Sequence, residues 1–151
     1  MKIDAINKKI LFLLQKDARM TYKEIAEELN RSETTIRDRI KAMERIGIIQ
    51  GYTALINKTA LGLNFFAIIH GNPEKPGDLD NLTEKIKKVK NVLRVYQISG
   101  EQRLAIFIVA PSYSHLKEII KNQLLPLGVT DEEIISVLQA DQEFISPLEI
   151  P

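Results

Sequence analysis

The chain has 151 residues, of which 44% are hydrophobic, 27% charged and 6% aromatic, and it contains no cysteine. These proportions are typical of a globular protein with one average domain or two small ones, and they exclude disulfides, thiolate metal sites and cysteine nucleophiles. No apolar run reaches the ~18–20 residues that cross a bilayer, so we expect a cytoplasmic protein with no membrane partner.

The net charge of +1 conceals a difference between the two parts of the chain. Residues 1–60 carry 12 Lys and Arg against 8 Asp and Glu, whereas residues 61–151 carry 9 against 12. A basic N-terminal module beside an acidic C-terminal one indicates that the first module meets an anionic partner.

Residues 1–51 predict short helices with recognisable ends. Asp4 suits the N-cap of a first helix, which carries apolar residues at helical spacing and ends near Lys16. Thr21 and Glu24 have the spacing of a capping box, which predicts the start of a second helix. Asn30 then stands at a sharp turn, where Asn tolerates the left-handed conformation better than most residues.

A third helix is predicted after this turn. Ser32 suits its N-cap, and the helix runs to about Ile46 with Gly47 as its C-cap. Its inward face consists of the apolar residues Ile36, Ile40 and Met43. Three short helices with a tight turn before the last one predict a helix-turn-helix domain at residues 1–51, of the winged-helix-like kind.

The spacing of apolar residues along the chain changes after this domain. Residues 48–57 alternate partly and predict a short strand pair or a hinge strand, and residues 52–64 form the expected linker. Strands are predicted at 65–72, 92–99, 103–110 and 133–144, with helices at 78–89 and after Ser112 or Ser114. The order βαββαβ predicts a ferredoxin-like domain at residues 65–151, so the fold class is α+β.

The predicted strand Leu104–Val109 is apolar on both faces. Two helices cover only one face of the expected sheet, so the other face would stay bare in a monomer. We therefore predict a homodimer that packs through this sheet.

The third helix carries the main functional signal. Five basic residues lie between Arg31 and Arg45, and an exposed helix of this kind can place Arg and Thr side chains in a DNA groove. The alternative is a solvated helix whose charges serve solubility, and Tyr22 equally suits a packing role. The predicted contacts to double-stranded DNA are Tyr22, Lys23, Arg31, Ser32, Glu33, Thr34, Thr35, Arg37, Asp38, Arg39, Lys41 and Arg45.

An ordered series of segments runs through residues 3–62. It comprises Ile3-Asp4, Ile10-Leu11, Leu14, Asp17-Ala18-Arg19, Glu24-Ile25-Ala26, the run from Ser32 to Ile40, the run from Gly47 to Ala54, Asn57 and Leu61-Gly62. This series closely resembles the Lrp/AsnC, or feast/famine, family of transcriptional regulators, and the second half resembles that family's regulation-of-amino-acid-metabolism domain. The resemblance implies a nucleoid-associated, DNA-binding dimer that assembles into tetramers, octamers or larger rings.

The resemblance also implies an amino-acid effector bound by residues 65–151, the oligomerisation domain. The family's turn between the second and third strands is roughly Thr-Gly-x-x-Asp, which helps to hold the effector's amino group. The corresponding residues of this chain are Ser99, Gly100, Glu101, Gln102 and Arg103. Arg103 repels an ammonium group and attracts a carboxylate, so the ligand is a different one, such as an acidic or basic amino acid, or none. The alternative is a plain hairpin turn with surface charges.

The sequence lacks the constellations that catalysis requires. His70 and His115 have no partner at a catalytic spacing, and there is no phosphate-binding loop or nucleophile elbow. We predict neither enzyme activity nor a metal or cofactor. The leading prediction is a sequence-specific transcriptional regulator. The alternatives are a non-specific, chromatin-like DNA-binding protein and a small-molecule-binding module or enzyme subunit.

Overall fold

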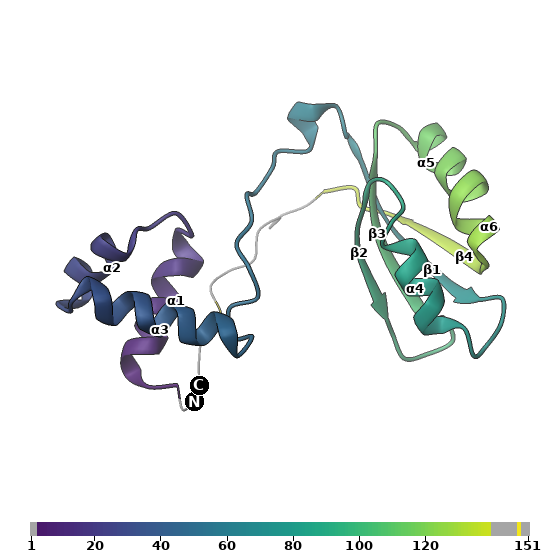
Figure 1. Ribbon diagram of the computed structural model, residues 1–151. Helices are drawn as coiled ribbons and strands as arrows, with labels where there is room; N and C mark the ends of the chain where they lie inside the picture. Colours follow the sequence, from purple (N-terminus) through teal and green to yellow (C-terminus); the bar gives the residue numbers. More distant parts are fainter. Residues whose placement is uncertain (1–2, 140–147, 149–151) are drawn as a thin grey trace. The chain divides into compact units, whose positions relative to one another are not determined.

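The computed structural model describes residues 3–139 and Leu148. The chain divides into a first unit, to which the residues up to Leu55 and Leu148 belong, and a second unit that begins at Ile56 (Figure 1). The first unit contains the helices α1 (Ala5–Lys16), α2 (Tyr22–Leu29) and α3 (Glu33–Arg45). Their shared core consists of Ile10, Ile25, Ala26, Ile36, Ile40 and Met43. Each fully buried apolar side chain of this size stabilises the fold by roughly 1.5–3 kcal/mol.

The predicted helix starts are confirmed. The Asp4 carboxylate accepts the backbone N–H of Asn7 at 2.8 Å. Thr21 and Glu24 form a complete capping box before α2, and Ser32 caps α3. These side chains satisfy N–H groups that have no partner inside a helix, and so they fix where each helix begins.

The chain leaves both α2 and α3 through a residue in the left-handed conformation. Asn30 adopts the predicted left-handed conformation with φ 50°, and the next N–H, of Arg31, donates to the carbonyl of Ala26 at 2.9 Å. The expected C-cap at Gly47 needs a small correction, because α3 ends at Arg45 and Ile46 is the capping residue. Gly47 follows with φ 76° and supplies the left-handed turn.

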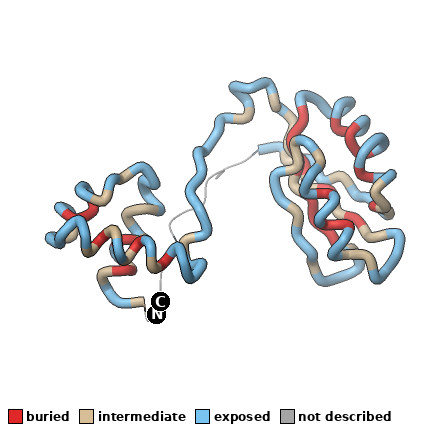
Figure 2. The backbone as a smooth tube through the Cα atoms, viewed as in Figure 1, coloured by how far each residue is buried: buried red, intermediate tan, exposed pale blue. Residues whose placement is uncertain are grey.

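The strand pair expected at residues 48–57 is not formed. No residue of this segment lies in a strand, and residues 50–57 are exposed, as the tube after α3 shows (Figure 2). Leu55 and Ile56 remain 66% and 54% exposed. A strand needs a partner for its backbone groups, and partial alternation in a sequence does not supply one.

The second unit has the predicted βαββαβ order. It contains β1 (Phe65–Pro73), α4 (Leu79–Ile86), β2 (Val92–Gln97), β3 (Leu104–Ala110), α5 (Tyr113–Ile119), α6 (Leu125–Leu127) and β4 (Val129–Ser136), preceded by a 3-10 turn at Thr59–Leu61. The described strands form one antiparallel sheet in the order β2-β3-β1-β4, and the helices cover one of its faces (Figure 1). The α+β class and the ferredoxin-like fold are thus confirmed.

Several predicted bounds of this unit were wrong. The helix expected at 78–89 ends at Ile86, although Val89 still packs against the core. The strand expected at 133–144 begins at Val129 and ends at Ser136, and residues 140–144 lie outside the described part of the chain. The acidic run 131–133 concealed this strand, because exposed charged residues interrupt its apolar pattern.

A π-helical turn at Ile120–Leu124 separates α5 from α6. Of the two expected caps of α5, Ser112 is the one used, since its hydroxyl accepts the N–H of His115 at 3.2 Å. Pro126 follows the π turn, and a proline lacks an N–H and crowds the carbonyl four residues before it.

Candidate nucleic-acid interface and ligand site

The side of α3 opposite its buried residues carries a line of polar side chains, which we name the outward stripe. At 100° per residue these positions lie on one face of the helix, about 16 Å long at 1.5 Å per residue. The outward stripe consists of Thr34, Arg37, Asp38, Lys41 and Arg45. These side chains are exposed, apart from the half-buried Arg37.

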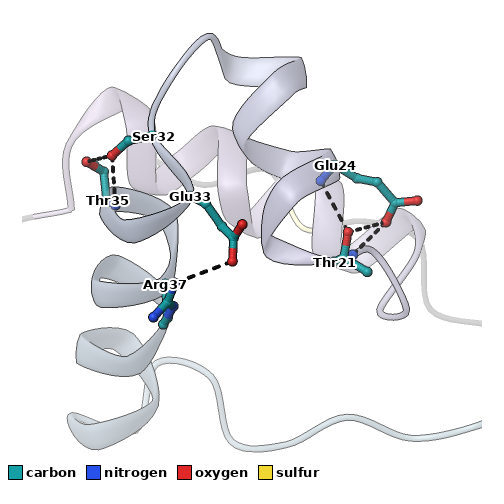
Figure 3. A network of polar contacts seen from close by, with 6 residues as sticks. All are labelled: Thr21, Glu24, Ser32, Glu33, Thr35 and Arg37. Atoms are coloured by element: carbon teal, nitrogen blue, oxygen red, sulfur yellow. Dashed lines mark hydrogen bonds and ion pairs between the residues drawn. The ribbon is translucent and has the colours of Figure 1, made fainter.

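The start of α3 is held by its own hydroxyl groups (Figure 3). The Ser32 hydroxyl accepts the N–H of Thr35 at 3.2 Å, and the two hydroxyl oxygens lie 2.7 Å apart. Both side chains are therefore occupied in capping. Thr34 makes no side-chain hydrogen bond within the described residues, which leaves its hydroxyl and methyl groups available.

Charges on the outward stripe are only partly neutralised. Arg37 donates to Glu33 at 3.3 Å, one helical turn away (Figure 3). Lys41, Arg45 and Asp38 have no ion pair with any described residue. The stripe therefore presents two unpaired cations and one weakly paired cation against a single unpaired carboxylate, so its field attracts anions.

Arg39 occupies a different position from the other predicted DNA contacts. Its guanidinium donates to the Asp4 carboxylate at 2.7 Å and to the side-chain oxygen of Asn7 at 2.9 Å, and only 29% of its side chain is exposed. The N–H of Asn7 and the Arg39 guanidinium together lower the pKa of Asp4. Arg39 thus joins α3 to α1, and the structure does not place it on the outward stripe.

The remaining predicted DNA contacts lie at the start of α2 and in the turn before α3. Tyr22 is half-buried and packs against the core of the unit, which favours the packing alternative. Lys23 is exposed and lies 3.9 Å from Glu27. The Arg31 guanidinium donates to the carbonyl of Asn30 at 2.8 Å and remains exposed.

Tyr52 makes a polar contact that the sequence did not predict. Its hydroxyl donates to the Glu44 carboxylate at 2.9 Å, so the segment after α3 is tied to the end of that helix. Burial and the neighbouring Glu44 raise the pKa of Tyr52 to about 12. No local pattern joins two such residues eight positions apart.

The turn between β2 and β3 holds the predicted effector contacts. Ser99, Gly100 and Glu101 are exposed at its tip, and Gly100 has φ 124°. The N–H of Arg103 donates to the side-chain oxygen of Asn72 at 3.0 Å. The Arg103 guanidinium is exposed and has no hydrogen bond or ion pair within the described chain.

The start of β4 lies beside this turn, which the sequence did not indicate. The register between β1 and β4 shifts between His70 and Asn72, where two β4 residues, Asp131 and Glu132, stand opposite the single residue Gly71. Gln102 donates its side-chain N–H to the carbonyl of Asp131 at 3.2 Å. Asn72 donates to the Asp131 carboxylate at 3.5 Å. The acidity of this segment was visible in the sequence, but its proximity to the turn depends on the sheet order.

Among residues 3–139 and Leu148, no group of three or more His, Cys, Asp and Glu side chains is arranged to hold a metal ion. No helix in the described part of the chain is both long and apolar enough to span a membrane.

Family models match both parts of the chain. The model described as winged helix-turn-helix DNA-binding matches residues 3–50, and the model described as the Lrp/AsnC ligand binding domain matches residues 64–141. The HTH-type transcriptional regulator LrpA of Pyrococcus horikoshii is 40% identical over 129 residues, which are 85% of this chain and 91% of the relative. The regulator Ptr1 of Methanocaldococcus jannaschii is 33% identical over 125 residues, 83% of this chain and 84% of the relative.

Solved structures share the fold. Escherichia coli AsnC has a TM-score of 0.87 at 23% identity, and the match covers 98% of this chain and 100% of that one. A Neisseria meningitidis transcriptional regulator, solved as a complex with L-Met, has a TM-score of 0.88 at 23% identity, with 98% and 97% covered. At this identity the likeness concerns the fold.

Proposed function

Because the chain belongs to the Lrp/AsnC family of transcriptional regulators, we propose that it recognises DNA through the outward stripe of α3. The chain is a helix-turn-helix, sequence-specific DNA-binding regulator. Its family is not normally enzymatic, and we assign it no catalysis. A cytoplasmic, nucleoid-associated location follows from this role as part of the proposal.

The charge of the outward stripe is the observation that supports this interface. An α-helix with its side chains is about 10–12 Å across, which fits the major groove of B-DNA at about 12 Å. Lys41 and Arg45 form no ion pair with the residues that the structure describes and therefore suit phosphate contacts. Thr34 and Arg37 lie nearer the start of α3, where a recognition helix reads base edges.

The test is a titration of the full chain against the DNA upstream of its own gene and against a scrambled duplex. Arg37→Ala should weaken binding to the specific duplex by about 1–3 kcal/mol if Arg37 reads a base. Lys41→Ala should weaken binding to both duplexes and reduce the salt dependence. The control is Lys9→Ala on α1, outside the outward stripe, which should change neither affinity.

Each result has a defined meaning. Unchanged binding of both Arg37→Ala and Lys41→Ala would remove the outward stripe from the interface. Equal affinity of the unmodified chain for specific and scrambled DNA would favour an architectural, chromatin-like protein instead.

We propose that the second unit forms a homodimer through the face of its sheet that the helices leave uncovered. Phe107 lies on this face with its ring 5.5 Å from that of Tyr96 and 6.3 Å from that of Phe66. Ile68 pairs with Ile135 in the adjoining strands and adds aliphatic surface. A contiguous apolar face of this kind marks an interaction site. Tetramers, octamers or larger rings would then form from such dimers.

The second unit also supplies the proposed regulation. The matching model is named for ligand binding, and one structural neighbour was solved with L-Met. We propose that a small molecule binds at the turn between β2 and β3 and changes the affinity for DNA. Ser99, Gly100, Glu101, Gln102 and Arg103 are the proposed contacts.

A further inference from the structure

The last turn of α3 carries a carboxylate beside the cations of the outward stripe. Glu44 is exposed, precedes Arg45 and follows Lys41 by three residues. At 100° per residue it lies about 60° from Lys41 around the helix, between the stripe and the buried Ile40. Residues three positions apart are neighbours on a helix surface, so Lys41 is within reach of this carboxylate.

The ion pair that this spacing favours is nevertheless not formed. Lys41 has no ion pair with any described residue, while the Glu44 carboxylate accepts the hydroxyl of Tyr52 at 2.9 Å. Residues 40, 47 and 48, at the other helical spacings from Glu44, are Ile, Gly and Ile, so no second cation competes for it. The carboxylate therefore binds a neutral donor, and the cation beside it stays free.

The chain after α3 brings Tyr52 to this position. It turns back at Gly47, and the N–H groups of Ile48 and Ile49 donate to the carbonyl of Met43 at 2.9 and 3.3 Å. Ile49 also packs against the core of the first unit. These contacts fix the chain three residues before Tyr52, so its side chain starts from a fixed point beside the end of α3.

The Tyr52 hydroxyl is the stronger partner for this carboxylate. Burial, the bond to Glu44 and the neighbouring Tyr22 raise the pKa of Tyr52 to about 12, so the hydroxyl keeps its proton at neutral pH and donates it. A hydrogen bond to a carboxylate is charge-assisted and stronger than one between neutral groups. An exposed ion pair on a helix gains little in water. Glu44 therefore binds Tyr52 in preference to Lys41.

We propose that Tyr52 is a positioning residue for DNA recognition, which holds the Glu44 carboxylate away from Lys41 and so keeps Lys41 free for a DNA phosphate. This inference rests on the proposed role of the outward stripe and adds to it a residue from outside α3. A lysine that is paired within the protein must break that pair to bind a phosphate, and the cost lowers the affinity. The contact to Tyr52 removes this cost before DNA binds.

Asp38 is the other carboxylate near Lys41. It lies at the same spacing on the opposite side of Lys41, and it has no ion pair within the described part of the chain. Its side chain is one methylene group shorter than that of glutamate. Glu44 is therefore the carboxylate with the reach to occupy Lys41 once the Tyr52 hydroxyl is removed.

The test is a series of parallel titrations of the full chain against the specific and the scrambled duplex. Tyr52→Phe removes the hydroxyl and keeps the ring. It should weaken binding to both duplexes by about twofold, the effect of one exposed ion pair on a helix. The difference should shrink as the salt concentration rises, because salt screens the new pair between Glu44 and Lys41.

Two further backgrounds show whether the effect passes through Glu44 and Lys41. Tyr52→Phe should have no effect in a chain with Glu44→Gln, because no carboxylate remains there to pair with the lysine. It should also have no effect in a chain with Lys41→Ala. A merely structural role of Tyr52 would weaken binding equally in every background.

Tyr113→Phe is the matched control. It removes a hydroxyl from a tyrosine of similar exposure, 47% against 50% for Tyr52, at the start of α5 in the second unit. Both affinities should stay unchanged in this variant. Circular dichroism and the thermal midpoint of each variant confirm that the chain is folded.

Two results would overturn the proposal and leave the proposed function intact. One is unchanged binding by Tyr52→Phe although Lys41→Ala weakens binding. The other is an equal loss in Tyr52→Phe with and without Glu44→Gln. Unchanged binding by Lys41→Ala would instead count against the outward stripe itself, and with it against this role of Tyr52.

Discussion

Arg39 and Asp4 form the contact that joins α3 to α1. The guanidinium lies 2.7 Å from the carboxylate and also binds the side-chain oxygen of the buried Asn7. The sequence predicts Asp4 as a cap from local spacing alone. The sequence could not pair Arg39 with Asp4, because the two residues lie 35 positions apart. An Arg on a basic helix has the same sequence pattern whether its side chain contacts DNA or another part of the protein.

The Asp4 contact predicts a pH dependence of stability. The pKa of Asp4 is lowered in the folded chain, so its ionised form stabilises the fold above the ordinary value of 3.8. This contribution is lost as the pH falls through the lowered pKa, since the unfolded chain binds the proton more readily. Asp4→Asn should therefore lower the thermal midpoint at pH 7, and this difference should shrink towards zero as the pH falls below 3.8.

The measurement is the thermal unfolding of both chains from pH 7 to pH 2. Asp17→Asn, at the opposite end of α1 and outside the Arg39 contact, is the control. A difference between Asp4→Asn and the unmodified chain that stays constant over this range would contradict the ionic contribution of Asp4.

At the level of elements, the predicted helices of the first unit needed only a one-residue correction at the end of α3. Caps and apolar spacing are local signals, so α1, α2 and α3 could be read directly from the sequence. The start of β4 could not be read in this way, because its first residues pair with β1 around a bulge whose acidic residues are exposed. The position of Asn72 and Asp131 beside the turn between β2 and β3 was missed for the same reason, since only the sheet order brings them to Arg103.

The close packing at the bulge predicts that a larger residue at position 71 destabilises the fold. A Cβ atom at this position would lie 2.9 Å from Cγ1 of Val129 and 3.1 Å from the carbonyl oxygen of Thr130. Gly71→Ala should therefore lower the free energy of unfolding by about 1–3 kcal/mol through overpacking. Urea unfolding of the full chain provides the measurement.

Gly77→Ala provides the matched control. A Cβ at Gly77 meets no atom within 4 Å, and its backbone is not left-handed. This variant should be as stable as the unmodified chain or slightly more stable. Equal stability of the Gly71 and Gly77 variants would show that the bulge has room to relax.

At the level of the whole molecule, the change from helical to strand periodicity allowed the two folds and their order to be predicted. The prediction of a strand pair at residues 48–57 was wrong, because local alternation does not reveal whether a partner strand exists. The apolar residues on both faces of β3 predict a second layer on the sheet, and the resulting dimer remains a proposal.

The proposed dimer is tested by Ile135→Glu. Ile135 is 37% exposed on the uncovered face of the sheet, so a buried carboxylate at this position should convert the dimer to monomers. Leu125→Glu is the matched control, because Leu125 is 38% exposed on α6, on the helical side. Sedimentation of both variants and of the unmodified chain gives the oligomeric state.

An unchanged state for Ile135→Glu, with circular dichroism like that of the unmodified chain, would place the dimer interface elsewhere. Dissociation by Leu125→Glu alone would place it on the helical side.

The exposed segment at residues 50–57 has a consequence for how such proteins diversify. It contributes no side chain to either core and belongs to no helix or strand. Doubling the length of a flexible loop costs only about 0.6 kcal/mol, so insertions in this segment should leave the cores of both units intact. Recombination at this segment could therefore exchange one DNA-reading unit for another while the ligand-binding unit is inherited unchanged.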